Sequence, residues 1–114
     1  MSLIEYYKSP VVWKSAEVAT VGTTTTVWTP TSGTRVVLDS AIISVYGPNT
    51  TTVSLIFGAD SLAVVPNRIA VINLSASASV NLKFPGVTNG IIDQVVRVTT
   101  AAAPVSVNLY GFEI

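Results

Sequence analysis

The 114-residue sequence predicts an all-β protein: an antiparallel, jelly-roll-like β-sandwich of eight to nine short strands with little helix. Three observations lead to this prediction. Apolar residues alternate with Ser, Thr and Asn in several segments, and Gly, Pro and Asn recur between these segments. No segment sustains the 3.6-residue periodicity of an amphipathic helix. An immunoglobulin-like sandwich is the alternative, although the Cys-Trp-Cys framework of that fold is absent.

The expected strands differ in how their apolar residues are distributed. Strict alternation, which indicates one buried and one solvated face, marks residues 53–57, 80–84 and 105–109. Apolar residues on both faces, which indicate a central strand or an interface, mark residues 35–46, 69–74 and 91–99. Shorter strands are expected at 17–21, 24–28 and 62–65. Turn-forming residues predict reversals at 29–33, 47–50, 58–61, 66–67, 85–90 and 101–104.

The first 15 residues differ from the regular series of strands that follows. We therefore expect an N-terminal arm at residues 1–15 and a β-sandwich domain at residues 16–114. The arm is rich in large apolar and aromatic side chains, which are typical anchors of protein interfaces: Leu3, Ile4, Tyr6, Tyr7, Val11 and Trp13. Two placements are open, an arm that binds another molecule and an extra edge strand on its own domain.

The composition narrows the function classes. The sequence has no His and no Cys, and only 11% of its residues are charged. Thiolate chemistry, disulfides and Cys/His metal sites are thereby excluded, and the usual acid–base group at neutral pH is missing. The net charge is zero, the basic residues are scattered and no apolar run could span a membrane as a helix. We expect no enzyme activity, no cofactor or metal, and no nucleic acid or membrane partner.

Low charge together with 49% apolar residues favours association, because little electrostatic repulsion keeps copies of the chain apart. We therefore expect much of the surface to be covered by identical copies or by a partner protein. The N-terminus also lacks the basic start and apolar core of a secretory signal.

Two kinds of side chain remain as candidates for binding or chemistry. A small glycosidase would need two facing carboxylates, but none of the six stands out by spacing, and surface carboxylates are expected: Glu5, Glu17, Asp39, Asp60, Asp93 and Glu113. The aromatic residues suit either a sugar-stacking platform, with Trp28 as its test residue, or a protein interface: Tyr6, Tyr7, Trp13, Trp28, Tyr46 and Tyr110.

The stretch TTTTVWTPTSGTRVVLDSAIIS and the ending VSVNLYGFEI resemble small jelly-roll-like virion proteins of tailed bacteriophages. In the first stretch a strand ends at Trp28, Pro30 and Gly33 form a turn, and Arg35 opens a long apolar strand. The resemblance covers residues 16–114, and its motif is structural. It implies a capsid decoration (cement) or head-fibre protein, most often a homotrimer, located at the capsid surface or tail of a virion. The implied partner is the major capsid protein or another virion protein. The alternative is a carbohydrate-binding or receptor-binding module of a phage fibre or tail.

Overall fold

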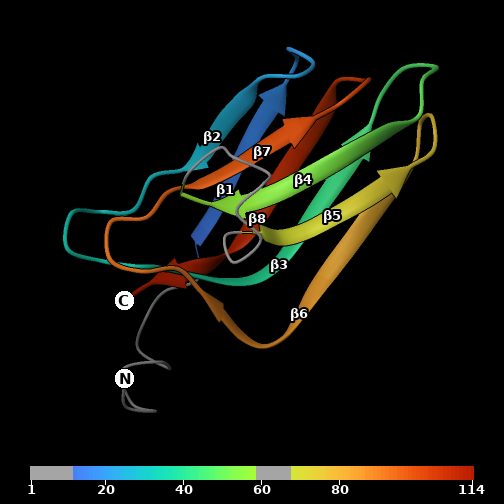
Figure 1. Ribbon diagram of the computed structural model, residues 1–114. Coiled ribbons are helices and arrows are strands. Elements are labelled where there is room, and N and C mark those ends of the chain that lie inside the picture. Colours follow the sequence, from blue (N-terminus) through green and yellow to red (C-terminus); the bar gives the residue numbers. More distant parts are fainter. Residues whose placement is uncertain (1–11, 59–67) are drawn as a thin grey trace.

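The structure is a computed structural model that describes residues 12–58 and 68–114. These residues form eight strands in two four-stranded sheets, one in front of the other in Figure 1, and they contain no helix. The predicted all-β sandwich is confirmed. The strands are β1 (Val12–Val18), β2 (Thr24–Trp28), β3 (Val36–Val45), β4 (Thr51–Phe57), β5 (Arg68–Leu74), β6 (Ser79–Asn89), β7 (Val96–Thr100) and β8 (Val105–Glu113).

The topology is that of a jelly roll. Sheet A has the strand order β1-β8-β3-β6, and sheet B has the order β2-β7-β4-β5. Strand β1 pairs with β8, β2 with β7, β3 with β6, and β4 with β5, always antiparallel. This is the pairing of one long antiparallel ribbon that has been rolled into two sheets, as in the jelly roll. It places the first and last described strands side by side.

The core lies between the two sheets and is built by alternate residues of each strand. In β8, Val105, Val107 and Leu109 are fully buried, whereas Ser106 and Asn108 between them are partly exposed. Trp28, at the end of β2, is the largest fully buried side chain among the described residues. Each such side chain contributes about 1.5–3 kcal/mol through burial, so the sandwich needs no disulfide to be stable.

A β-bulge interrupts β3 where it crosses the centre of sheet A. The register shifts between Leu38 and Ser40 against both neighbours. Against β8, Asp39 is an extra residue of β3, whereas against β6 the extra residues belong to β6, which has residues 84–87 between the partners of Leu38 and Ser40. Opposite the bulge, a Cβ atom on Gly111 would lie 2.0 Å from the carbonyl oxygen of Val37. Only glycine allows the two backbones to approach this closely.

The N-terminal part of the sandwich differs from the prediction. The expected strand at 17–21 is wrong: β1 covers Val12–Val18 and is followed by a turn in which Gly22 has a φ of +77°. Strand β1 is an edge strand of sheet A. The expected boundary between arm and domain, after residue 15, therefore lies inside β1.

Two further predictions around the β6–β7 connection need correction. The turn expected at 85–90 is wrong, because β6 continues to Asn89. The strand expected at 91–99 is wrong for its first half, because β7 begins only at Val96. Asp93, with a φ of 65°, places the chain in a left-handed turn that hydropathy alone does not reveal. The strand expected at 62–65 lies outside the described residues.

Candidate functional site

The predicted arm residues are described only at Trp13. Its side chain lies on β1 and is 62% exposed. The indole stacks on the ring of Tyr110 in β8, with centroids 5.6 Å apart and planes 22° from parallel. Its Nε1–H donates to Oδ1 of Asn108 over 3.1 Å. Trp13 is thus held in one orientation on the outer face of sheet A. The other predicted arm residues lie outside the described residues: Leu3, Ile4, Tyr6, Tyr7 and Val11.

The predicted turn motif forms one end of the sandwich. Trp28 is fully buried, and its Nε1–H donates to Oε2 of Glu113 over 2.8 Å. Pro30 is buried in the turn that follows, and Gly33 has a φ of +85°. The backbone of Arg35 exchanges two hydrogen bonds with that of Ile114, of 2.9 and 3.0 Å. The motif therefore fastens the β2–β3 connection to the end of β8, and the prediction that Trp28 offers a stacking surface to a sugar is wrong.

Glu113 is the acceptor at the centre of this end. Besides the indole of Trp28, its carboxylate accepts hydrogen bonds from the backbone N–H of Thr31 (2.9 Å) and the hydroxyl of Thr34 (3.1 Å). Desolvation opposes ionisation and by itself raises the pKa of Glu113, but the hydrogen bonds outweigh it and lower the pKa to about 2. Glu113 is therefore ionised at neutral pH and is a structural acceptor, unsuited to donate a proton as a general acid.

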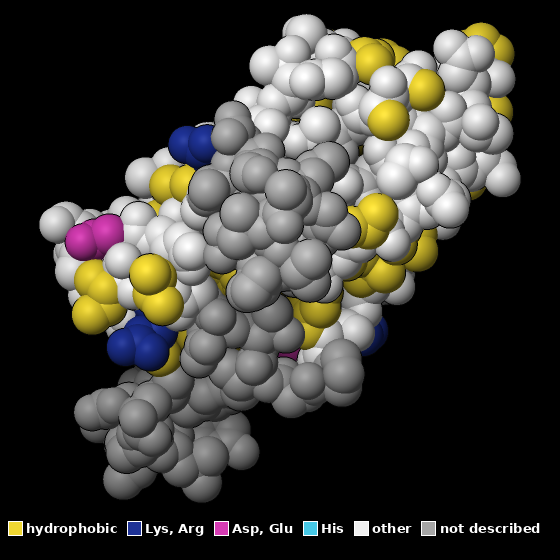
Figure 2. All heavy atoms as spheres, in the orientation of Figure 1, with side chains coloured by type: hydrophobic (Ala, Val, Ile, Leu, Met, Phe, Trp, Pro, Cys, Tyr) yellow, Lys and Arg dark blue, Asp and Glu magenta, His cyan; other side chains and the backbone are white. Residues whose placement is uncertain are grey.

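The same end presents two adjacent isoleucines to solvent. Ile91 and Ile92 are 68% and 53% exposed at the tip of the β6–β7 connection. The tip is fixed from both sides: Ile91 N–H donates to the side chain of Gln94 over 3.1 Å, and Asp93 Oδ1 accepts from Gly33 N–H over 2.6 Å. Figure 2 shows apolar side chains beside charged groups where the β2–β3 and β6–β7 connections end, on the left. We call Ile91 and Ile92 the apolar tip.

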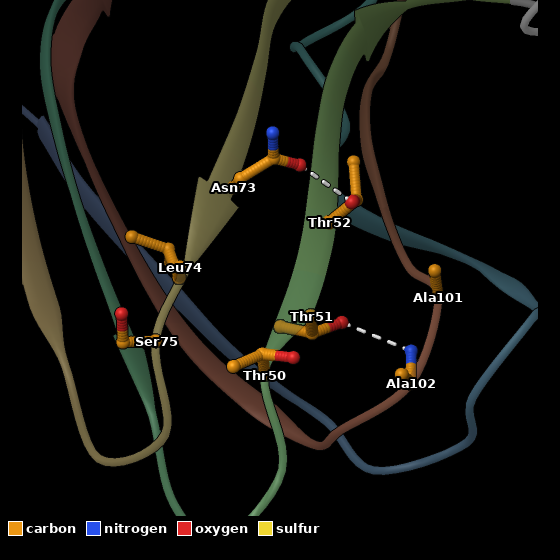
Figure 3. Close-up of a pocket in the computed structure, with 8 residues that line it drawn as sticks. All are labelled: Thr50, Thr51, Thr52, Asn73, Leu74, Ser75, Ala101 and Ala102. Atoms are coloured by element: carbon orange, nitrogen blue, oxygen red, sulfur yellow. Dashed lines mark hydrogen bonds between the residues drawn. The ribbon is translucent and has the colours of Figure 1, made fainter.

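A neutral hollow lies at the opposite end of the sheets. It has a volume of about 370 Å³, and Figure 3 shows that its lining combines hydroxyl, amide and methyl groups: Thr50, Thr51, Thr52, Asn73, Leu74, Ser75, Ala101 and Ala102. The hydroxyl of Thr52 donates to Oδ1 of Asn73 over 2.7 Å. None of the lining residues is ionisable, so the hollow offers hydrogen bonds but no acid–base chemistry.

The described carboxylates with printed partners bind uncharged donors. Asp93 and Glu113 do so at the tip end, and Glu17 accepts a hydrogen bond from the hydroxyl of Tyr46. That hydrogen bond raises the pKa of Tyr46. Within residues 12–58 and 68–114, no three acidic side chains gather as a possible metal site. No helix in the described part of the chain is long and apolar enough to cross a membrane.

Neither a family model nor a curated protein matches the chain. Among solved structures, it is similar to a protein of the Bacillus endospore appendages, a novel family of disulfide-linked pili, with 10% identity and a TM-score of 0.43. The match covers 98% of this chain and 96% of that chain. A similarity at this level carries no argument about function.

Two features of the sites described above could not be predicted from any local pattern in the sequence. The Trp13–Tyr110 pair depends on the register between β1 and β8, whose partners are nearly the whole domain apart in sequence. The acceptor role of Glu113 depends on three donors from the β2–β3 connection. The apolar tip did have a signal, the adjacent isoleucines, but their hydropathy favoured the wrong prediction of a strand.

Proposed function

We propose that the chain is a non-enzymatic structural protein that acts by assembling with copies of itself and with a partner protein. In its finer form, the proposal is a homotrimeric capsid decoration protein that binds the major capsid protein, or another virion protein, at the surface of a virion. The finer form rests on the resemblance of residues 16–114 to small virion proteins of tailed bacteriophages.

The observation that carries the proposal is the rigid apolar tip. Ile91 and Ile92 are mostly exposed, yet the turn that holds them is fixed by hydrogen bonds to Gln94 and Gly33. Burying both side chains against a partner would contribute about 2–4 kcal/mol. Because the turn is already ordered, little conformational entropy is lost on binding.

The charge of the molecule supports the same proposal. Six basic and six acidic residues give a net charge of zero at pH 7, so copies of the chain do not repel one another. Large apolar side chains are also exposed away from the tip, at Tyr46 and Val71. A stable sandwich with such a surface suits a protein that locks neighbouring subunits together.

The test of assembly is the native mass of the purified chain, measured by light scattering on a sizing column. A homotrimer has three times the chain mass of 11.9 kDa, about 36 kDa. The double variant Ile91→Ser/Ile92→Ser should shift the mass toward the monomer if the tip joins copies, or leave the trimer intact and reduce capsid binding if it contacts the partner. The matched control is Val21→Ser, which removes an exposed side chain at the opposite end. A wild-type monomer would contradict the homotrimer.

Capsid binding needs a separate experiment. The chain is mixed with tailed-phage capsids stripped of their decoration protein, and bound material is measured by co-sedimentation. Deletion of residues 1–11 tests whether the predicted arm carries the binding, since this deletion leaves β1 whole. Binding that survives the deletion would refute the arm, and a trimer that binds no capsid would refute decoration but leave assembly standing.

A further inference from the structure

The outer face of sheet A has a composition unlike that of a protein interface. Cross-strand registers arrange its outward-facing residues in three rows of four, each crossing β1, β8, β3 and β6. At about 4.8 Å between strands, the rows are about 14 Å long. The rows are Trp13, Tyr110, Ser40, Lys83; then Ser15, Asn108, Ile42, Asn81; then Glu17, Ser106, Ser44, Ser79. We call these residues the sheet A face.

One corner of the sheet A face is aromatic and preorganised. Trp13 is 62% exposed although its indole is fixed on one side by the ring of Tyr110 and at Nε1 by Asn108. A ring that is both fixed and exposed offers a flat apolar surface at a small entropic cost. The C–H-bearing face of a pyranose ring is the kind of flat, weakly apolar group that packs on such a surface.

The remainder of the sheet A face consists mainly of uncharged hydrogen-bonding groups. Serine hydroxyls and asparagine amides occupy seven of the twelve positions, one of which (Ser40) is only 8% exposed, and Ile42 is the one aliphatic residue. The two charged residues, Glu17 and Lys83, lie at opposite corners, and Glu17 is engaged by Tyr46. A protein partner would leave many of these polar groups imperfectly paired, which costs binding free energy. A ligand with many hydroxyl groups would pair with them.

We infer that the sheet A face binds a neutral oligosaccharide, with a pyranose ring stacked on Trp13 and neighbouring sugar hydroxyls bonded to the serine and asparagine side chains. The absence of a cationic cluster within the twelve positions excludes an acidic glycan as the preferred ligand. The site is separate from the apolar tip, so the inference does not depend on the proposed assembly. It also places sugar stacking at Trp13, whereas the sequence had offered Trp28 as the test residue.

The experiment is isothermal titration of the full chain with neutral hexasaccharides of glucose, galactose, mannose and N-acetylglucosamine, in α and β linkage. We expect at least one to bind with a Kd below about 1 mM. Trp13→Ala should weaken that binding about tenfold or more, equivalent to about 1.4 kcal/mol, and Asn81→Ala should weaken it severalfold. The matched control is Val71→Ala, which removes an exposed side chain from sheet B and should bind as the wild type does.

Tryptophan fluorescence gives a second readout. Trp28 is buried and serves as a constant background, so a change in emission on adding the sugar reports on Trp13 and should vanish in Trp13→Ala. Thermal unfolding of each variant checks that the fold is kept.

Several outcomes would overturn the inference. The proposed site would be refuted if no hexasaccharide, up to about 10 mM, gave a binding heat or a change in fluorescence. Undiminished binding by Trp13→Ala would place the sugar elsewhere, and binding of acidic oligosaccharides alone would exclude a neutral ligand. A loss of oligomer mass in Trp13→Ala would show that a second copy, not a sugar, covers the sheet A face.

Discussion

Replacing Glu113 by Gln removes the negative charge at the tip end of the sandwich while keeping one oxygen acceptor. The carboxylate accepts from Trp28, Thr31 and Thr34, and the indole N–H of Trp28 is on a fully buried side chain that water cannot reach. The amide of Gln presents a single acceptor oxygen, so at least one of these donors loses its partner. A buried donor without a partner costs about 1–3 kcal/mol.

The pKa of Glu113 gives a second magnitude for the same hydrogen bonds. Its fall from the ordinary value of 4.5 to about 2 corresponds to about 3 kcal/mol of extra interaction with the ionised form. The carboxylate is only partly shielded from water, so we expect about half of this to appear as stability. The first argument gives about 1–3 kcal/mol and the second about 1.5 kcal/mol, so we expect Glu113→Gln to lose about 1–2 kcal/mol at pH 7.

The pH dependence has a definite sign. Because the pKa in the folded state lies below that of the unfolded chain, the stabilisation is complete above about pH 5 and is lost as the pH falls toward 2. The difference in stability between wild type and Glu113→Gln should therefore be largest at neutral pH and shrink steadily on acidification.

The difference in stability is measured by urea unfolding followed by circular dichroism, at a series of pH values from 7 to 3. Urea is uncharged, so it does not screen the charge of the carboxylate as a salt would. Asp39→Asn is the matched control, since Asp39 is an exposed carboxylate at the bulge of β3. The control should change the free energy of unfolding by less than about 0.5 kcal/mol. A loss below that value for Glu113→Gln, or a loss that does not vary with pH, would refute the role assigned to this carboxylate.

Three further substitutions test the fold. Gly111→Ala would bring a Cβ atom to 2.0 Å from the carbonyl oxygen of Val37. We expect urea unfolding to show a loss of about 3 kcal/mol in the free energy of unfolding, or a failure to fold. Wild-type stability would contradict the close approach. Thr100→Val breaks a series of hydrogen bonds in which Thr51 donates to Thr100 over 2.7 Å and Thr100 donates onward to a backbone carbonyl over 2.5 Å. The same assay should show a loss of about 1–3 kcal/mol in the free energy of unfolding. An unchanged free energy of unfolding would contradict these hydrogen bonds. Leu109→Ala creates a cavity in the centre of the core and should lower the free energy of unfolding by about 2–5 kcal/mol; a loss under about 1 kcal/mol would mean that the sheets can close the gap.

The fold class could be predicted from the sequence because the core residues alternate with polar residues along several strands. In β8, apolar residues alternate with polar ones along Val105–Glu113, and the structure buries the apolar set as expected. Turn chemistry was equally informative at Gly33, whose positive φ matches its place in the predicted turn. Hydropathy patterns failed where side-chain hydrogen bonds determine the backbone conformation. This is the case beside the apolar tip, at Asp93 and Gln94.

The surfaces that carry the proposals could be predicted only in part. Trp13 was expected in an interface, but its stacking partner Tyr110 lies almost a hundred residues later in the chain and meets it only because β1 closes sheet A beside β8. The sheet A face has the same origin, since each of its rows draws one residue from each of four strands. No local pattern specifies such a row, because the register is set by the packing of the whole sandwich.

The fold itself explains why the proposed assembly site and the proposed sugar site can coexist. The apolar tip lies on a connection between strands, where hydrogen bonds to the side chain of Gln94 and to Gly33 of the β2–β3 turn hold it rigid. The sheet A face lies on the broad side of the sandwich, where alternate residues point away from a core that their neighbours have filled. Contacts made at the end of a jelly roll leave its broad face open, so a trimer joined through the tip would present three copies of the sheet A face. Weak binding of a sugar at each copy would then add up to a strong attachment by multivalency.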